Sequence, residues 1–162
     1  MPKKRQMLGS MTRVVKKNRA LAALLCVAVV SGCYWRSYPD RVRTHTELLV
    51  AFARKARDLV ATGRFTAESL PELTYPLERA AAYAAEGRRR AATAPASLVA
   101  FEALVARYRA FVDLVDETRR SRRGPEAAKA LDEPLAALEA DARAVTAMLD
   151  LEREGRAGSA PR

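Results

Sequence analysis

Apolar residues recur at alternating intervals of three and four positions over most of the chain after residue 43, which is the spacing of one face of an α-helix. The third such stretch is the most regular. We expect Ser97 to cap its N-terminus, and Gly124 to follow the basic run that ends it. Its apolar face is predicted to consist of Leu98, Phe101, Val105, Tyr108, Val112 and Val115. The pattern indicates a helix that packs against others along one stripe.

The first stretch begins with a helix-start signal. Thr44 and Glu47, three residues apart, form a capping box, and Gly63 suits the left-handed position after the last turn. The inward residues are expected to be His45, Leu49, Phe52, Ala56 and Leu59. Residues 33–43 show no period, so the helix is expected to begin at Thr44 and the preceding segment to be a tether.

Prolines mark the second and fourth stretches. Pro76 clashes with a continuous helix, so we expect a break or kink there, with the main body of the second helix over about 76–92. The fourth helix is expected to start at Pro125, a favoured first-turn position, and to kink near Pro134. The inward residues of these two helices are predicted to be Leu77, Ala80, Ala81 and Ala84, and Leu131, Leu135, Leu138, Ala142, Val145 and Leu149.

The expected fold class is all-α. Short connections between four amphipathic helices predict an up-down-up-down four-helix bundle over residues 44–154. The string Leu-Val-Ala-Phe occurs at 49–52 and again at 98–101, which supports pairing the helices into two hairpins. The last residues, 155–162, are expected to form a disordered tail.

The first 32 residues differ in composition from the rest of the chain. They hold seven basic side chains and no acidic one, and they contain an eleven-residue apolar run, Ala20–Val30. A membrane-spanning helix needs about 20 apolar residues, so this run has instead the length found in an export signal. A shorter signal with the same order of features begins at Met11, so Met11 is an alternative start to Met1.

A short motif follows the apolar run, and it consists of Val30, Ser31, Gly32 and Cys33. The motif resembles the lipobox of bacterial lipoproteins, in which a branched apolar residue and two small residues precede an invariant cysteine. The resemblance covers residues 11–33. It implies that a signal peptide of residues 1–32 is removed, that Cys33 carries a thioether-linked diacylglycerol, and that the new amine of Cys33 carries an N-acyl chain such as palmitate.

The resemblance also implies a location in the cell envelope. In lipoproteins of bacteria with two membranes, Asp after the lipidated cysteine commonly marks retention in the inner membrane, and Tyr34 stands there instead. The expected location is therefore the outer membrane, facing the periplasm. In a bacterium with one membrane, the domain would lie on the outer face of the cytoplasmic membrane.

The net charge of +10 overstates the charge of the mature chain. The signal holds 7 of the 29 Lys and Arg, which leaves 22 basic against 19 acidic side chains, or +3. That value offers little long-range attraction for nucleic acid, which export also removes as a partner. Cys26 lies in the signal and Cys33 is consumed by the lipid, so the mature domain is expected to hold no disulfide and no cysteine metal site.

Two groups of side chains are candidates for membrane or partner contact. Tyr34 and Trp35 follow the lipidated cysteine, and such rings favour a bilayer interface, although a plain linker is an equal alternative. Arginines at two predicted helix ends complement the helix dipole, and they also suit anionic headgroups or an acidic partner. They are Arg88, Arg89 and Arg90 in the second helix, and Arg119, Arg120, Arg122 and Arg123 at the end of the third.

Little in the sequence indicates catalysis. The mature chain has a single histidine, no free thiol and few hydroxyls, so we expect no enzyme and no cofactor beyond the lipid. His45 and Met148 would meet at one end of an antiparallel bundle. Such a pair resembles the iron ligands of the small periplasmic haem b four-helix cytochromes, with the two residue types exchanged between helices. Haem ligation is a minor alternative to ordinary packing.

Three classes of function fit these observations. The first is a non-catalytic scaffold or accessory subunit of an envelope assembly, held at the membrane by lipid and contacting an envelope protein of unknown identity. The second is a bundle that binds a small ligand or haem, and the third is an immunity or exclusion lipoprotein. We expect the first and keep the other two as alternatives.

Overall fold

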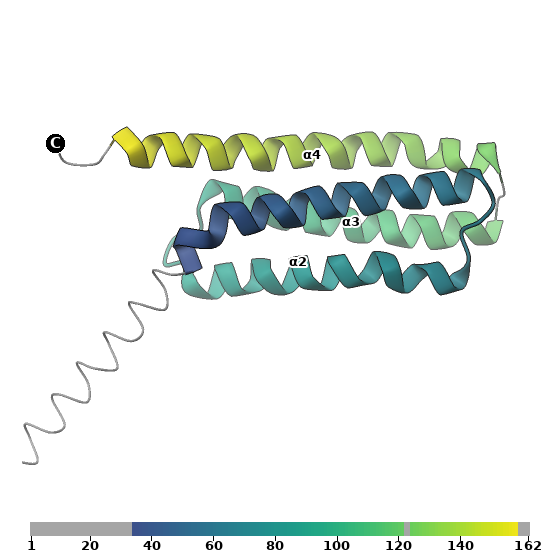
Figure 1. Cartoon of the computed structure of the whole chain (residues 1–162), viewed down its shortest axis with the longest axis horizontal. Helices are drawn as coiled ribbons and strands as arrows, with labels where there is room; N and C mark the ends of the chain where they lie inside the picture. The colour runs from purple at the N-terminus through teal and green to yellow at the C-terminus, as the bar shows by residue number, and fades with distance from the viewer. Residues whose placement is uncertain (1–33, 122–123, 159–162) are drawn as a thin grey trace, which may run out of the picture. The chain divides into compact units, whose positions relative to one another are not determined.

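The structure is a computed structural model that describes residues 34–121 and 124–158. Within these ranges the protein is all-helical and contains no strand. The first helix covers residues 34–61 and carries no label in Figure 1. It is followed by the 3-10 turn η1 (Ala67–Ser69) and by helices α2 (Leu70–Arg90), α3 (Ala96–Ser121) and α4 (Pro125–Gly158). The prediction of an all-α helical bundle is confirmed.

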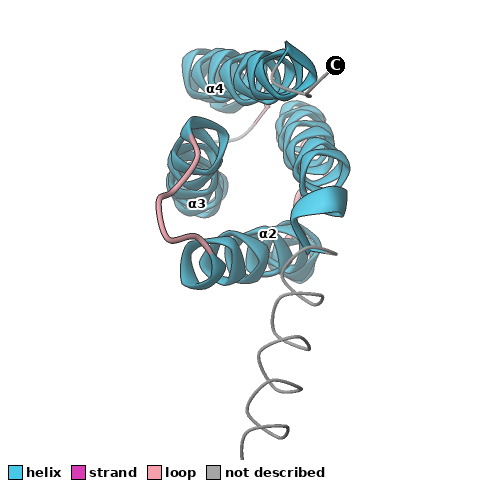
Figure 2. Cartoon of the chain, turned by 90° about the vertical axis from the view of Figure 1, so that its left-hand side faces the viewer, coloured by secondary structure: helices cyan, strands magenta, loops and turns pink. Residues whose placement is uncertain are grey.

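The helices of residues 39–158 pack around a common core. Helix α3 contacts both α2 and α4. The first helix lies between α2 and α4 on the other side of the bundle (Figure 2), with Lys55 bound to Glu72 of α2 at 2.6 Å and Arg57 bound to Asp132 of α4 at 2.9 Å. The largest fully buried side chains in this part of the chain are mostly aromatic and leucine residues, among them Tyr108, Phe101, Phe111, Leu49, Leu98, Leu104, Leu131, Leu138 and Leu149.

The start of the first helix differs from the prediction. Residues 34–43 are helical, so the expectation that the helix begins at Thr44 was wrong. The Thr44 hydroxyl donates to the Asp40 carbonyl, four residues earlier, at 2.9 Å, which is the bond of a threonine inside a helix and not of a cap. The domain therefore extends further toward the N-terminus than residue 44.

The buried face of the first helix is rotated relative to the predicted one. Leu49 and Ala56 are buried as expected, but His45, Phe52 and Leu59 are only half-buried. The positions that do face the core carry residues of mixed size and polarity, namely Val42, Thr46, Leu49, Ala53, Ala56 and Val60. Ala53 and Ala56 on this face are small, whereas the larger Phe52 and Leu59 beside them are only half-buried.

Gly63 ends the first helix as predicted. Its φ of 66° is in the left-handed region. The Arg64 amide donates to the Leu59 carbonyl at 2.8 Å and the Gly63 amide to the Val60 carbonyl at 3.0 Å, which is the hydrogen-bond pattern of a Schellman motif. The carbonyls at the end of the helix are thereby satisfied while the chain turns toward η1.

Helices α2 and α4 both continue through a proline. Pro76 and Pro134 lie inside uninterrupted helices, so the expected break at Pro76 was wrong, and a bend at either residue stays a prediction. The ring of Pro76 is buried in the bundle. Its packing offsets the hydrogen bond that proline cannot donate. Of the predicted inward residues of α2, Leu77, Ala80 and Ala84 are buried.

The start of α3 is capped from another helix. Ser97 is not the N-cap that we expected, because the Pro95 carbonyl accepts the first helical bond, from the Leu98 amide at 3.0 Å. Ser97 is fully buried one residue inside the helix. Its amide and its hydroxyl each donate to the Glu152 carboxylate of α4, both at 2.8 Å. A carboxylate is well placed there, because a helix N-terminus carries partial positive charge.

The bodies of α3 and α4 follow the predicted pattern closely. All six predicted seam residues of α3 are buried. Helix α4 starts at Pro125 as expected, and its seam is buried except at Leu135, which is half-buried. Helix α4 continues to Gly158, so the expected disordered tail was wrong for residues 155–158, and its last four residues lie outside the described part of the chain.

One buried polar contact joins α2 and α3. The Tyr108 hydroxyl donates to the Leu73 carbonyl at 3.2 Å inside the bundle. Burial raises the pKa of this phenol well above its ordinary value, because the interior disfavours a phenolate. Tyr108 is therefore neutral at pH 7 and can donate this hydrogen bond. Among the described residues, no helix is both long enough and apolar enough to span a bilayer.

Truncation of the centre of the α3 seam tests this core. Phe101→Ala removes a ring with no exposed surface and is expected to lower the free energy of unfolding by about 3–5 kcal/mol. Val99→Ala, on the exposed face of the same helix, is the control and is expected to change it by less than about 0.5 kcal/mol. Denaturant unfolding measures both, and a loss below about 1 kcal/mol for Phe101→Ala would contradict the assigned seam.

The same substitution at two glycines tests the left-handed cap. Gly63→Ala forces a Cβ into a positive-φ residue and is expected to cost about 1 kcal/mol, although nothing lies within 4 Å of the added carbon. Gly155→Ala adds a Cβ in open space on the helical backbone of α4 and is expected to stabilise the protein by up to about 1 kcal/mol. Thermal or denaturant unfolding should give opposite signs, and equal signs would exclude the cap.

Candidate functional site: a basic, aromatic groove

A groove of about 420 Å³ runs between the first helix and α2. One wall comes from residues of the first helix that are three or four positions apart and so share a face. The other wall comes from the middle of α2. The groove is lined by Arg41, Thr44, His45, Leu48 and Phe52 of the first helix, and by Tyr75, Pro76 and Arg79 of α2.

The floor of the groove is apolar, and part of it is open to solvent. Leu48 is 42% exposed and Tyr75 is 60% exposed, which makes them two of the few large apolar side chains on the described surface. The His45 ring is held from behind, with its centroid 5.4 Å from that of Tyr83 and 6.3 Å from that of Phe101. Core aromatic residues therefore fix the position of the imidazole in the groove wall.

The charge of the groove is positive on both walls. Arg41 and Arg79 are exposed, and none of the eight lining residues is acidic. Arg79 donates to the Tyr75 hydroxyl at 3.0 Å, and its guanidinium carbon lies 5.7 Å from the centre of the same ring. Arg41 has no ion pair or hydrogen bond among the described residues. Among the described residues, neither guanidinium group binds a carboxylate that would neutralise it.

The pKa of His45 reports the electrostatics of this groove. Burial lowers that pKa below the ordinary value of 6.5, and the charges of Arg79 and Arg41 lower it further. His45 is therefore mainly neutral at pH 7. The pKa of His45 is lower in the folded protein than in the unfolded chain. The stability contributed by neutral His45 is therefore present above pH 6.5 and is lost as the pH falls through the folded pKa.

Two other grooves have balanced charge. The groove between the first helix and α4, about 530 Å³ in volume, is lined by both acidic and basic residues. Ion pairs cross it, from Arg54 to Glu139 and from Arg43 to Asp150, both at 2.7 Å. The groove between α3 and α4 contains Arg107, which pairs with Asp141. Among the three, only the groove between the first helix and α2 combines uncompensated positive charge with exposed apolar side chains.

The arginines at the end of α2, predicted as contact residues, are paired with carboxylates. Arg88 binds Glu102 of α3 with two nitrogens, one at 2.9 Å. Arg89 and Arg90 both bind Glu86, and their hydrogen bonds lower the pKa of that carboxyl. Much of the positive charge of this cluster is therefore balanced within the protein.

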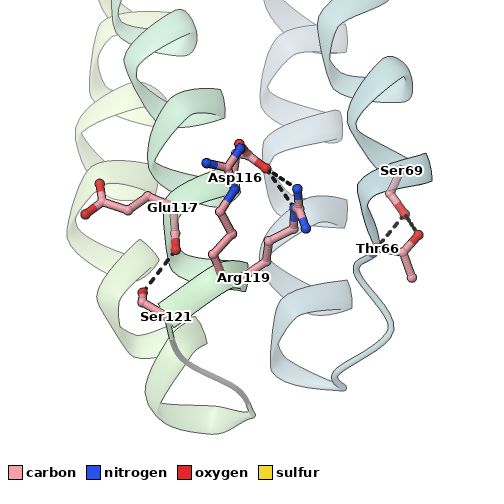
Figure 3. Close-up of polar contacts among 7 residues, drawn as sticks. Thr66, Ser69, Asp116, Glu117, Arg119 and Ser121 are labelled. Carbon is pink, nitrogen blue, oxygen red and sulfur yellow. Dashed lines mark hydrogen bonds and ion pairs between the residues drawn. The ribbon is translucent and has the colours of Figure 1, made fainter.

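The arginines at the end of α3 are arranged in the same way. Arg119 and Arg120 both bind Asp116, one turn earlier on the helix, and Arg119 does so through Nε at 2.7 Å (Figure 3). Figure 3 also shows the hydrogen bond between the Thr66 and Ser69 hydroxyls at η1. Arg122 and Arg123 lie outside the described residues. The sequence pattern located these clusters but not the carboxylates that bind Arg88, Arg89, Arg90, Arg119 and Arg120.

The predicted aromatic contact residues form a cluster of their own. Tyr34 and Trp35 are half-buried, with ring centroids 5.2 Å apart in an edge-to-face arrangement. Tyr38 joins them, 4.9 Å from Trp35. The predicted lipidation and cleavage residues, Val30, Ser31, Gly32 and Cys33, lie outside the described part of the chain.

The two candidate haem ligands have different surroundings. His45 is stacked against Tyr83 in the groove wall, whereas Met148 is 37% exposed on α4 and lines none of the three grooves. Within residues 34–121 and 124–158, no group of three or more His, Cys, Asp or Glu side chains is arranged to hold a metal ion. Nothing in this geometry favours the haem alternative.

The comparisons with known proteins give no relatives for this chain. No protein-family model matches it, and neither a curated protein nor a solved structure is significantly similar to it. The functional argument therefore rests on the residues themselves. Sequence reasoning named His45 but missed the groove around it. The one available signal was that Arg41, His45, Leu48 and Phe52 share a helical face, and the α2 wall could not be paired with that face from sequence alone.

A titration of the single histidine tests the groove electrostatics. The His45 imidazole, followed by proton NMR, is expected to titrate below pH 6.5. Arg79→Gln removes one nearby cation and is expected to raise the midpoint toward that value. Arg109→Gln, an exposed arginine of α3 with no ion pair, is the matched control and should leave it unchanged. A wild-type midpoint at or above 6.5 would contradict the described groove.

Proposed function

We propose that this protein is a lipid-anchored, non-catalytic protein of a bacterial envelope that serves as a scaffold or accessory subunit by docking a partner on its helical bundle. The anchor is the acylated Cys33, formed after removal of residues 1–32. The location is the outer membrane, facing the periplasm, in a bacterium with two membranes, and the outer face of the cytoplasmic membrane otherwise. The observation that carries the docking part is the basic groove between the first helix and α2.

The anchor is supported by the order of features in the sequence. A basic segment, an apolar run of eleven residues and the motif Val-Ser-Gly-Cys occur in the order found in lipoprotein precursors. The mature domain follows with little intervening chain, because residue 34 is already helical. Two lipid attachments suffice for stable membrane binding, and Cys33 would carry the diacylglycerol and an N-acyl chain.

We also infer that the four helices run up-down-up-down. Contacts between the first helix and α4 support this order, since Arg43 binds Asp150 whereas Arg57 binds Asp132, so that residue numbers rise along one helix as they fall along the other. The same antiparallel relation holds for the other neighbouring helices. Its contacts are His45–Tyr83 and Lys55–Glu72 between the first helix and α2, Arg88–Glu102 and Tyr108–Leu73 between α2 and α3, and Ser97–Glu152 and Arg107–Asp141 between α3 and α4. The interhelical ion pairs are consistent with this register, although exposed pairs of this kind add little stability.

Replacement of the two cysteines in turn tests the anchor. Intact-mass analysis of the membrane fraction is expected to give residues 33–162 plus acyl chains for the wild type. Cys33→Ala is expected to give an unprocessed chain without lipid, because the acylated thiol is gone. Cys26→Ala, seven residues earlier in the signal, is the control and should be processed normally. A soluble, unacylated wild-type chain would overturn the anchor.

Crosslinking in the same membranes tests the scaffold part. The wild-type protein is expected to give a discrete crosslinked species with an envelope protein, which charge reversal in the groove (Arg41→Glu with Arg79→Glu) weakens. Arg109→Glu should leave it intact. A correctly acylated protein with no crosslinked partner would contradict the scaffold function while leaving the anchor in place.

A further inference from the structure

We propose that the groove between the first helix and α2 binds an acidic segment of a partner protein, with carboxylates at Arg41 and Arg79 and an apolar side chain against Leu48 and Tyr75. This inference deepens the proposed scaffold function and rests on it. It names the chemistry of the partner at that site. Charge, apolar surface and length each favour such an occupant.

The first step is charge complementarity. Arg41 and Arg79 stand on opposite walls of one groove, and no acidic residue lines it. Nine of the other described arginines bind a carboxylate within the protein. A guanidinium group offers a planar fork of donors that fits a carboxylate, so two such groups across a groove select an anionic occupant. The hydrogen bond from Arg79 to Tyr75 also orients that fork before binding.

The second step is the apolar surface that shares the groove with the two arginines. Leu48 and Tyr75 are exposed, and Phe52 is half-buried beside them. Protein interfaces are built around such apolar and aromatic side chains, with arginines that add orientation. A free inorganic anion would leave this surface in water, whereas an acidic segment that also carries leucine or phenylalanine would cover it.

The third step is length. Arg41 and Phe52 lie eleven residues apart on one helix, which corresponds to about 16 Å. That distance matches about three turns of a partner helix or five residues of an extended strand. A polypeptide segment of that length can place carboxylates and an apolar side chain in the groove together, whereas an anionic headgroup supplies charge without an apolar side chain. The shape and the charge together favour an acidic polypeptide segment over an anionic membrane surface.

The experiment uses the full lipidated protein in detergent micelles and two fluorescent peptides. The first peptide, of about a dozen residues, carries Glu at helical spacing beside Leu and Phe, and the second has Lys in place of every Glu. The wild-type protein is expected to bind the acidic peptide and not the basic one, as measured by fluorescence anisotropy. Binding should weaken as salt is added, because exposed charges are screened.

Charge reversal then identifies the residues. Arg41→Glu and Arg79→Glu are each expected to weaken binding of the acidic peptide by roughly fivefold, and the double variant should prefer the basic peptide. Arg109→Glu is the matched control for net charge and should bind like the wild type. The acidic peptide should also raise the pKa of His45, since it places carboxylates near the imidazole. Circular dichroism and the milder Arg41→Gln and Arg79→Gln variants separate these effects from misfolding.

Three outcomes would overturn the proposal. They are equal binding of both peptides, undiminished binding of the acidic peptide by the folded double variant, and groove-dependent binding only to vesicles of anionic phospholipid. The last would assign the groove to the membrane. An envelope partner that crosslinks irrespective of Arg41 and Arg79 would preserve the scaffold function and refute only this site. An unacylated chain that still binds the acidic peptide would refute the anchor and preserve this site.

Discussion

The structure depends on one apolar seam per helix, buried without any covalent help. Both cysteines precede the bundle, so no disulfide can hold it, and the free energy of folding must come from the contacts among α3 and its neighbours. Phe101, Leu104 and Tyr108 have no exposed surface. Polar contacts then select the register of the packed helices. The buried Ser97–Glu152 contact ties α4 to the start of α3, and ion pairs of the first helix tie it to α4.

The proposed docking surface follows from how that seam is arranged. Small residues such as Ala53 and Ala56 occupy the core-facing positions of the first helix, and its larger side chains are displaced to the edges. Phe52 and Leu48 thereby become available beside α2, where Pro76 and Tyr75 complete the groove. Arg41 and Arg79 lie at its rim without carboxylates, whereas the described arginines at the ends of α2 and α3 all bind a carboxylate. A cluster of charge in sequence is therefore a poor guide to free charge on this surface.

Periodicity predicted most of the fold but little of the candidate site. The seam of α3 could be predicted because large apolar residues recur there without interruption. The seam of the first helix could not be predicted in this way. Ala53 and Phe52 are adjacent candidates for the inward position, and hydrophobicity alone favours Phe52, whereas Ala53 is the buried residue. The capping of α3 by Glu152 joins residues 55 positions apart, and no local pattern indicates such a bond. A break was expected as one alternative at Pro76 because local propensity does not include the packing that offsets a missing hydrogen bond.

The central claim is that a tethered bundle presents this one groove to an acidic protein partner. Photo-crosslinking in intact envelopes tests it most directly, with the reactive residue placed at Leu48 or, as a control of similar exposure, at Val99 on α3. The account predicts a protein crosslink from residue 48 that disappears with Arg41→Glu and Arg79→Glu, and none of that identity from residue 99. Equal crosslinks from both positions, or crosslinks from residue 48 to lipid alone, would contradict it.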